Sequence, residues 1–355
     1  MSEISTLVEI SKYAGERFDL VQAGGGNSSV KYDNGEMIIK ASGFLLSDVN
    51  EDSGYSKVST QKIAQIVKNT NIINEHNKRD RESLTSQLVK EATIDKINRP
   101  SIETLLHSFL YKYTLHTHPI VVNMLVVRKD WKEILKLIFN DEEIVFVNYK
   151  TPGIELALEL DKELSKFDIT PNIIFLQNHG LIITSQYKSE IKIKTEYVIE
   201  KIEQYLKIDM DRYKTTNKIT YLLNTIQKSN NISYLTEDSY LNKQLLQNKD
   251  LFSATPFCPD SLVYCGISSV FINTEFDVVS VEQYRDKFHE LPKVIIFENK
   301  LYFIAVNVKK AKEMEEVFKF HIMVLAQNNK EITYLKLDEL AYLSNWEAEQ
   351  YRKDI

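Results

Sequence analysis

The first 210 residues alternate between segments with helical and with strand-like hydrophobic spacing. Residues 4–17 and 189–205 repeat apolar positions every three or four residues, which predicts amphipathic helices. Two further helices are predicted at 130–139 and 153–164. Short apolar runs predict strands at 28–32, 37–40, 115–119, 145–147, 173–176 and 181–184. Helices and strands that alternate in this way predict an α/β fold.

Another helix is predicted to begin at Ser101 and to end near residue 113. Ser101 is a favourable N-cap residue, and the apolar residues after it have helical spacing. The preceding segment, 69–100, is polar and rich in Asn, Lys and Glu, which predicts a surface excursion that contains a helix.

Residues 210–255 are polar, and we place a domain boundary or hinge there, with domains at 1–210 and 211–355. From Pro256 onward the pattern predicts a second, smaller α/β segment. Its predicted strands lie near 262–264, 294–297 and 302–306, its long helix at 311–325 and a final short helix at 346–350.

Composition and charge exclude several classes of function. The chain has 355 residues, 43% of them hydrophobic, which suffices for two domains with cores of their own. Its net charge of −6 offers no basic excess for a phosphate backbone, so nucleic acid is not an expected partner. Two cysteines exclude a disulfide scaffold, and no apolar run approaches the roughly 20 residues of a membrane helix. The N-terminus does not resemble a signal peptide, and a cytoplasmic protein is expected.

Three histidines form the strongest candidate for a chemical site. His116 and His118 are two residues apart in a predicted strand, so their side chains share one face. His179 lies in the predicted turn between two strands, from which a third imidazole can approach. Three neutral imidazoles leave one coordination position of zinc open for substrate. The spacing alone leaves a second interpretation open, in which these are hydrogen-bonded core histidines.

Glu103 lies in the first turn of the helix predicted from Ser101. A carboxylate is favoured there by the helix N-terminus alone, and it is also placed to act near a metal as a ligand or base. His107, one turn later, is expected to position Glu103 or to pack.

Two small-residue loops, Gly24–Asn27 and Ser42–Gly43, flank a predicted β-hairpin. Their backbone N–H groups and polar side chains are typical of an anion-binding nest, although glycines also serve turn geometry alone. The sequence contains no GxGxxG motif, so a nicotinamide cofactor is not expected.

These motifs resemble, in type and order, those of the class II aldolase and adducin family. Gly-Gly-Asn-x-Ser-Val, Ser-Gly, Ser-x-Glu, His-x-His-Pro and Gln-Asn-His-Gly follow one another between residues 25 and 180. The resemblance implies a three-layer α/β/α domain with a central, mainly antiparallel sheet. Residues 258–266 and 346–350 extend it to the aldolase part of bifunctional rhamnulose-phosphate aldolase/alcohol dehydrogenases, without their dehydrogenase domain.

The resemblance also implies roles for individual residues. His116, His118 and His179 would hold a divalent metal, most simply Zn²⁺, and Glu103 would be the catalytic acid/base, although it is closer in sequence to the first histidine than in L-fuculose-phosphate aldolase. The substrate phosphate would lie against Gly26, Asn27, Ser42, Gly43 and Ser101.

The reaction implied is cleavage or formation of a ketose phosphate through a metal-stabilised enediolate, with dihydroxyacetone phosphate and an aldehyde as products. A sugar-phosphate 4-epimerase or a decarboxylase of the same family is the alternative, and a non-catalytic adducin-like scaffold is a third possibility. The family also implies a homo-oligomer, with a tetramer favoured.

The C-terminal segment is predicted to repeat part of the metal-binding half in degenerate form. Residues 171–190 and 292–311 align without gaps, with their prolines coinciding. The alignment places His179 on Lys300, whose cationic side chain has no free lone pair, so this copy is predicted to hold no metal. The alternative is that any strand–turn–strand–helix unit would align as well.

Overall fold

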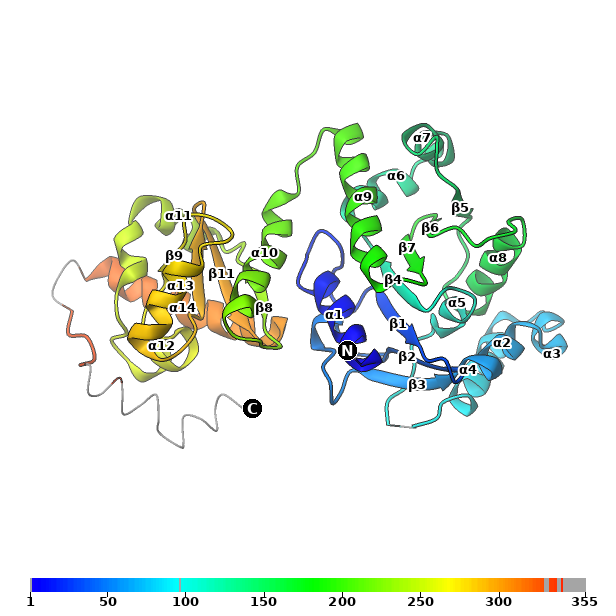
Figure 1. Ribbon diagram of the computed structural model, residues 1–355, viewed down its shortest axis with the longest axis horizontal. Coiled ribbons are helices and arrows are strands. Elements are labelled where there is room, and N and C mark those ends of the chain that lie inside the picture. Colours follow the sequence, from blue (N-terminus) through cyan, green and yellow to red (C-terminus); the bar gives the residue numbers. More distant parts are fainter. Residues whose placement is uncertain (1, 96, 329–331, 337–339, 341–355) are drawn as a thin grey trace. The chain divides into compact units, whose positions relative to one another are not determined.

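The computed structural model describes residues 2–95, 97–328, 332–336 and 340 (Figure 1). The chain divides into two compact units between Met210 and Asp211, and each unit contains its own sheet. No helix among the described residues has the length and apolar character needed to cross a membrane. The helix predicted at 346–350 lies outside the described residues.

A seven-stranded sheet forms the centre of the first unit, in the order β3-β2-β1-β4-β7-β6-β5. Its strands are β1 (Asn27–Lys31), β2 (Glu36–Lys40), β3 (Tyr55–Ser59), β4 (Tyr113–Thr117), β5 (Ile144–Val147), β6 (Ile173–Leu176) and β7 (Gly180–Ser185). All neighbours pair antiparallel except β5 and β6, which are parallel. The expected mainly antiparallel sheet is confirmed.

Helices cover both faces of this sheet. One face packs against α1 (Glu3–Gly15), α6 (Ile120–Val126), α7 (Trp131–Ile138) and α9 (Lys188–Leu206). The other packs against α2 (Thr60–Val67), α3 (Thr70–Ile73), α4 (Lys78–Glu91), α5 (Thr104–Ser108) and α8 (Ile154–Leu164). Alternate residues of β6 contribute to the two cores, Phe175 to the first and Ile174 to the second. The predicted three-layer α/β/α arrangement is therefore confirmed.

The prediction of one helix from Ser101 to residue 113 is wrong. Helix α5 begins after Glu103 and ends at Ser108, and Tyr113 already belongs to β4. The start is delayed because the backbone oxygen of Ser101 accepts the N–H of Thr104 in a turn. The end comes early because β4 pairs with β1 and β7 from Tyr113 onward.

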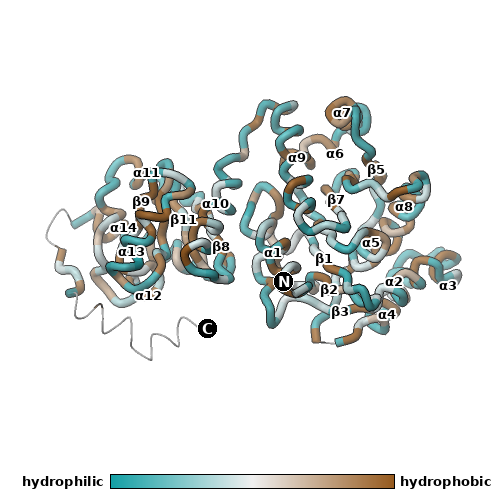
Figure 2. Tube along the Cα trace, viewed as in Figure 1, coloured by the Kyte–Doolittle hydropathy of each residue, from teal (hydrophilic) through white to brown (hydrophobic). Residues whose placement is uncertain are grey.

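A four-stranded sheet forms the centre of the second unit, in the order β8-β11-β10-β9. Its strands are β8 (Ile232–Leu235), β9 (Val270–Phe271), β10 (Val294–Phe297) and β11 (Lys300–Ala305). One face packs against α11 (Ser239–Gln247), α12 (Pro259–Cys265) and α14 (Val308–Gln327), and the other against α10 (Asp211–Ile226) and α13 (Val278–Phe288). Figure 2 shows hydrophobic residues along β9 and β11.

The strand predicted near 262–264 is wrong, because these residues lie in α12. Pro259 stands at the start of that helix, where its fixed φ and missing N–H are tolerated. Leu262 and Cys265, three residues apart, are buried on one side of it.

The second unit contains the strand–turn–strand–helix topology that the predicted repeat requires. Strands β6 and β7 form a hairpin that leads into α9, and β10 and β11 form a hairpin that leads into α14. The likeness extends one strand further, since β5 pairs parallel with β6 and β9 pairs parallel with β10.

The ungapped alignment of the two turns is wrong by one residue. Leu176 pairs with Gly180 in the first hairpin, which leaves three residues in the turn. Phe297 pairs with Lys300 in the second, which leaves two. Lys300 therefore corresponds to Gly180, and His179 has no counterpart in the second hairpin.

Candidate functional site

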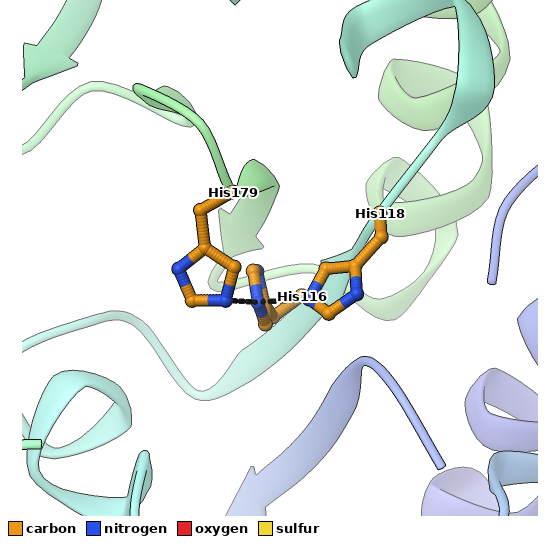
Figure 3. A group of neighbouring side chains, drawn as sticks. All are labelled: His116, His118 and His179. Atoms are coloured by element: carbon orange, nitrogen blue, oxygen red, sulfur yellow. Dashed lines mark hydrogen bonds between the residues drawn. The ribbon is translucent and has the colours of Figure 1, made fainter. Parts of the chain in front are cut away.

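Three imidazoles meet at one end of β4 (Figure 3). His116 lies in β4, His118 directly follows that strand, and His179 lies in the turn between β6 and β7. Nε2 of His116 is 3.1 Å from Nε2 of His118 and 3.3 Å from Nε2 of His179. The three ligand atoms all lie within 4.8 Å of one another.

The donor set and spacing of these histidines fit a divalent metal. Nδ1 of His116 lies 3.0 Å from the backbone oxygen of Leu181. Because that oxygen only accepts, Nδ1 carries the proton and Nε2 directs its lone pair to the centre of the group. With Zn–N bonds of about 2.0–2.1 Å, neighbouring nitrogens of a tetrahedral site lie about 3.4 Å apart, close to the separations found here.

Burial favours the neutral, metal-binding form of His116 and His118. Burial lowers the pKa of His116 well below its ordinary value, and it lowers the pKa of His118 to about 4, with His179 nearby acting in the same direction. Metal binding to His116 and His118 therefore does not have to displace a proton at neutral pH.

Glu103 lies directly beside the histidines, at the N-cap of α5. Its Oε1 is 3.3 Å from Nε2 of His179 and 3.5 Å from Nε2 of His116. Burial opposes ionisation of this carboxyl group, but His116 and His179 outweigh burial and hold its pKa well below the usual range. The structure thus brings a carboxylate whose pKa is lowered together with three imidazole rings.

The first part of the predicted anion site adjoins the histidines through the sheet. Asn27 begins β1 and lies opposite His116 of β4, with Gly26 directly before it. Asn27 is buried, and its Oδ1 accepts the N–H of Ser28.

The second part adjoins Glu103. The N–H of Ser42 donates to the backbone oxygen of Arg99, which places the Ser42–Gly43 loop beside the segment that contains Ser101. Oγ of Ser101 in turn accepts the N–H of Glu103 at 3.3 Å. Since the backbone N–H of Ser42 is already bonded, the hydroxyl group is the remaining donor of this residue.

Two glycines permit the close approach of the chain to the histidines. A Cβ atom at Gly25 would lie 2.7 Å from Nδ1 of His118. A Cβ atom at Gly180 would lie 2.2 Å from the backbone oxygen of Thr117. A larger residue at either position would displace the His118 ring or the backbone at Thr117. The two glycines therefore help to fix His118 and His179 in place.

Sequence reasoning missed Lys40, a buried lysine at the end of β2. Its Nζ donates to the backbone oxygen of Phe44 at 2.8 Å. Burial lowers the pKa of Lys40, whereas the charge of Glu103 raises it, and Lys40 itself lowers the pKa of His118. The signal in the sequence is a lysine that ends an apolar strand directly before a small-residue loop.

A buried ion network, also missed, holds the loop that supports His118. Arg17 donates two hydrogen bonds to the carboxylate of Asp19, at 3.0 and 2.5 Å, and a third to Glu196 of α9. The backbone oxygen of the following residue, Leu20, accepts the N–H of His118 at 2.9 Å. The network therefore fixes the segment against which His118 is bonded.

Comparison with known proteins gives this site a family. Residues 5–206 match the model of the class II aldolase and adducin N-terminal domain, which is more than half of the chain. The chain belongs to the class II aldolase and adducin family. The four residues of the candidate centre all lie within the matched region.

Individual relatives match a little more than half of the chain. The chain is 26% identical over 212 residues to the uncharacterized oxidoreductase YuxG of Bacillus subtilis (strain 168), covering 57% of this chain and 29% of YuxG. The chain therefore spans less than a third of the length of that relative. The N-terminal class II aldolase domain of a conserved protein from Thermoplasma acidophilum matches with a TM-score of 0.50 and 24% identity, over 58% of this chain and 94% of that one. An L-fuculose 1-phosphate aldolase matches with a TM-score of 0.40 and 16% identity, over 57% of this chain and 84% of that one.

Proposed function

We propose that this chain is a metal-dependent aldolase that cleaves or forms a ketose phosphate. The observation that carries the proposal is the convergence of three Nε2 atoms with Oε1 of Glu103 beside them. A scaffold protein has no use for this combination, which has one ionised base next to a set of metal-ligating lone pairs. Membership of the class II aldolase and adducin family supports the same proposal.

His116, His118 and His179 would hold the metal, most simply Zn²⁺. A bound divalent metal supplies Lewis acidity, which polarises a substrate carbonyl and stabilises negative charge next to it. Cleavage of the C3–C4 bond leaves its electron pair on the carbon next to that carbonyl, and Glu103 returns a proton there. In the reverse direction, Glu103 removes this proton.

The remaining residues would orient an anionic substrate. Asn27 lies opposite His116, and Ser101 accepts the N–H of Glu103; together with Ser42 and Gly43 they would bind the phosphate, with Gly26 shaping the loop. The buried cation of Lys40 favours an anion at the same place. A phosphate fixed in this way holds the reacting carbon in one position relative to Glu103.

The test is to incubate the zinc-loaded protein with a panel of ketose 1-phosphates and to measure dihydroxyacetone phosphate. A second assay follows exchange of a C3 hydrogen of dihydroxyacetone phosphate with deuterated water by NMR. Both activities are expected in the wild type, and both are expected to fail in Glu103→Gln. Epimerisation or decarboxylation without dihydroxyacetone phosphate would support the alternative reactions of the family. A zinc-loaded protein inactive on every substrate would support the scaffold.

A further inference from the structure

Strand β1 presents alternate side chains to two different helices. Ser28 points toward α1, where its Oγ lies 2.6 Å from Oγ of Ser11. Ser29 and Lys31 point to the opposite face and contact α5 and the residues that follow it. This alternation follows from the two-residue period of a strand.

Lys31 binds the C-terminal end of α5. Its Nζ donates to the backbone oxygen of Ser108 at 2.9 Å and to that of Leu110. Carbonyl groups at a helix end lack intrahelical donors and carry partial negative charge, so an ammonium group is well suited to them. Helix α5 has five residues, and a helix this short depends on tertiary contacts for its position.

His107 provides the second link between β1 and α5. Its Nδ1 lies 2.7 Å from Oγ of Ser29, and both residues are fully buried. The N–H of His107 donates to the backbone oxygen of Glu103, one turn earlier. A shift of the His107 ring would therefore be passed on to the start of the helix, where Glu103 lies.

We propose that Ser29 and Lys31 are positioning residues that hold α5 so that Glu103 keeps its place beside His116 and His179. Neither residue belongs to the set that would touch substrate or metal. The expected effect on kcat rests on the proposed function, whereas the expected effect on the position of Glu103 does not. Displacement of a reacting group by about 1 Å can reduce a rate about 10²-fold.

The test compares Lys31→Met, which removes the donor and keeps the aliphatic chain, with Lys31→Arg, which restores N–H donors. Lys57→Met is the matched control, because Lys57 lies in the nearby strand β3 and pairs with Glu36. Lys31→Met is expected to keep its zinc content and KM while kcat falls about 10- to 100-fold. Lys31→Arg is expected to recover most of kcat, and Lys57→Met to be unchanged.

A crystal structure of Lys31→Met supplies a readout independent of activity. Oε1 of Glu103 is expected to leave its contact distance from His116 and His179, while the three histidines stay in place. An unmoved Glu103, or full kcat in folded Lys31→Met, overturns the proposal. If Lys31→Met does not fold, the same two measurements on Ser29→Ala decide. A wild type inactive on all ketose phosphates would refute the proposed function, and the position of Glu103 in the variant would still test this inference.

Discussion

The β5–β6–β7–α9 segment of the first unit and the β9–β10–β11–α14 segment of the second have the same topology and different chemistry. In each, a parallel strand pair is followed by a hairpin and a long helix. Each hairpin also has an antiparallel neighbour on its other side, β4 in one unit and β8 in the other. The two sheets therefore share a four-strand arrangement.

The difference lies in a few side chains at the same end of this arrangement. Where the first hairpin carries His179 in a three-residue turn, the second has the two-residue turn Glu298–Asn299. His116 of β4 lies opposite Ile182, and the corresponding place on β8 is taken by Leu235, opposite Tyr302. The same arrangement of strands thus carries a candidate metal centre in the first unit, whereas the described residues of the second contain no such group; one turn residue and two neighbouring side chains make the difference.

Removal of a ligand from the first unit should have the largest effect. His116→Ala is expected to lower bound zinc from about one ion per chain to almost none, because two imidazoles hold zinc poorly. Elemental analysis after dialysis against trace zinc measures this. The exposed His76, also in the first unit, provides the control His76→Ala, which should retain its zinc. Equal zinc in both variants would exclude His116 as a ligand.

Removal of the carboxylate should separate catalysis from metal binding. Glu103→Gln is expected to keep its zinc and its fold and to lose about 10²–10⁴ in kcat, because the amide cannot accept a proton. The matched control is Glu298→Gln in the corresponding turn of the second unit, where Glu298 is exposed and pairs with Lys300. Turnover near the wild-type value in Glu103→Gln would show that Glu103 serves only the start of α5.

Truncation of core side chains should show which of the two segments zinc binding depends on. Phe175 in β6 and Phe303 in β11 are both fully buried. Replacement of either by Ala is expected to cost about 3–5 kcal/mol in the free energy of unfolding, measured in urea. Phe175→Ala is also expected to weaken zinc binding, since β6 leads into the His179 turn, whereas Phe303→Ala should not. Loss of zinc in folded Phe303→Ala would contradict this division.

Local patterns predicted much of the fold and of the candidate site. The His116–His118 pair follows from the period of a strand, and His179 follows from a turn between two apolar runs. The sequence misleads where a segment fits both the helical and the strand spacing. Tyr113 fits the helical spacing after Ser101, but it belongs to β4 because it pairs with distant strands. Residues 262–264 have strand propensity, but Pro259 begins a helix there.

Contacts over long sequence separations could not be predicted. Lys31 and Ser108 are 77 residues apart and Arg17 and Glu196 are 179 apart, so no local pattern links them. The ungapped alignment similarly concealed the shorter second turn, because strand registers decide which residues lie opposite one another.

A buried histidine should make the second unit sensitive to acid. His321 of α14 is stacked on Phe257, and its Nδ1 has no hydrogen-bond partner among the described residues. Burial lowers its pKa to about 4, against about 6.5 in an unfolded chain. Below pH 6.5 the unfolded chain therefore binds a proton that the folded chain does not, and stability falls as the pH falls toward 4.

The contribution of His321 is about 2 kcal/mol between pH 7 and pH 5. His107 and His118 of the first unit have pKa values shifted in the same direction, so the comparison needs a variant. Urea unfolding at both pH values is expected to show a loss about 2 kcal/mol smaller in His321→Leu than in the wild type. An equal loss of unfolding free energy in both proteins would show that groups other than His321 cause the acid sensitivity.

The smallest effect is expected at the turns themselves. Asn178 and Asn299 both have left-handed backbone conformations, with φ of 54° and 58°. Glycine adopts this conformation without a steric penalty, whereas for alanine the conformation costs about 1 kcal/mol in free energy. Asn299→Ala should therefore be about 1 kcal/mol less stable than Asn299→Gly in thermal unfolding, and the pair at Asn178 should differ by a similar amount. Zinc affinity should change only for Asn178→Ala, because Asn178 precedes His179 in the chain and no metal ligand adjoins Asn299. If Asn299→Ala and Asn299→Gly are equally stable, the second turn does not need a left-handed residue at position 299, and the likeness of the two segments is confined to their strands.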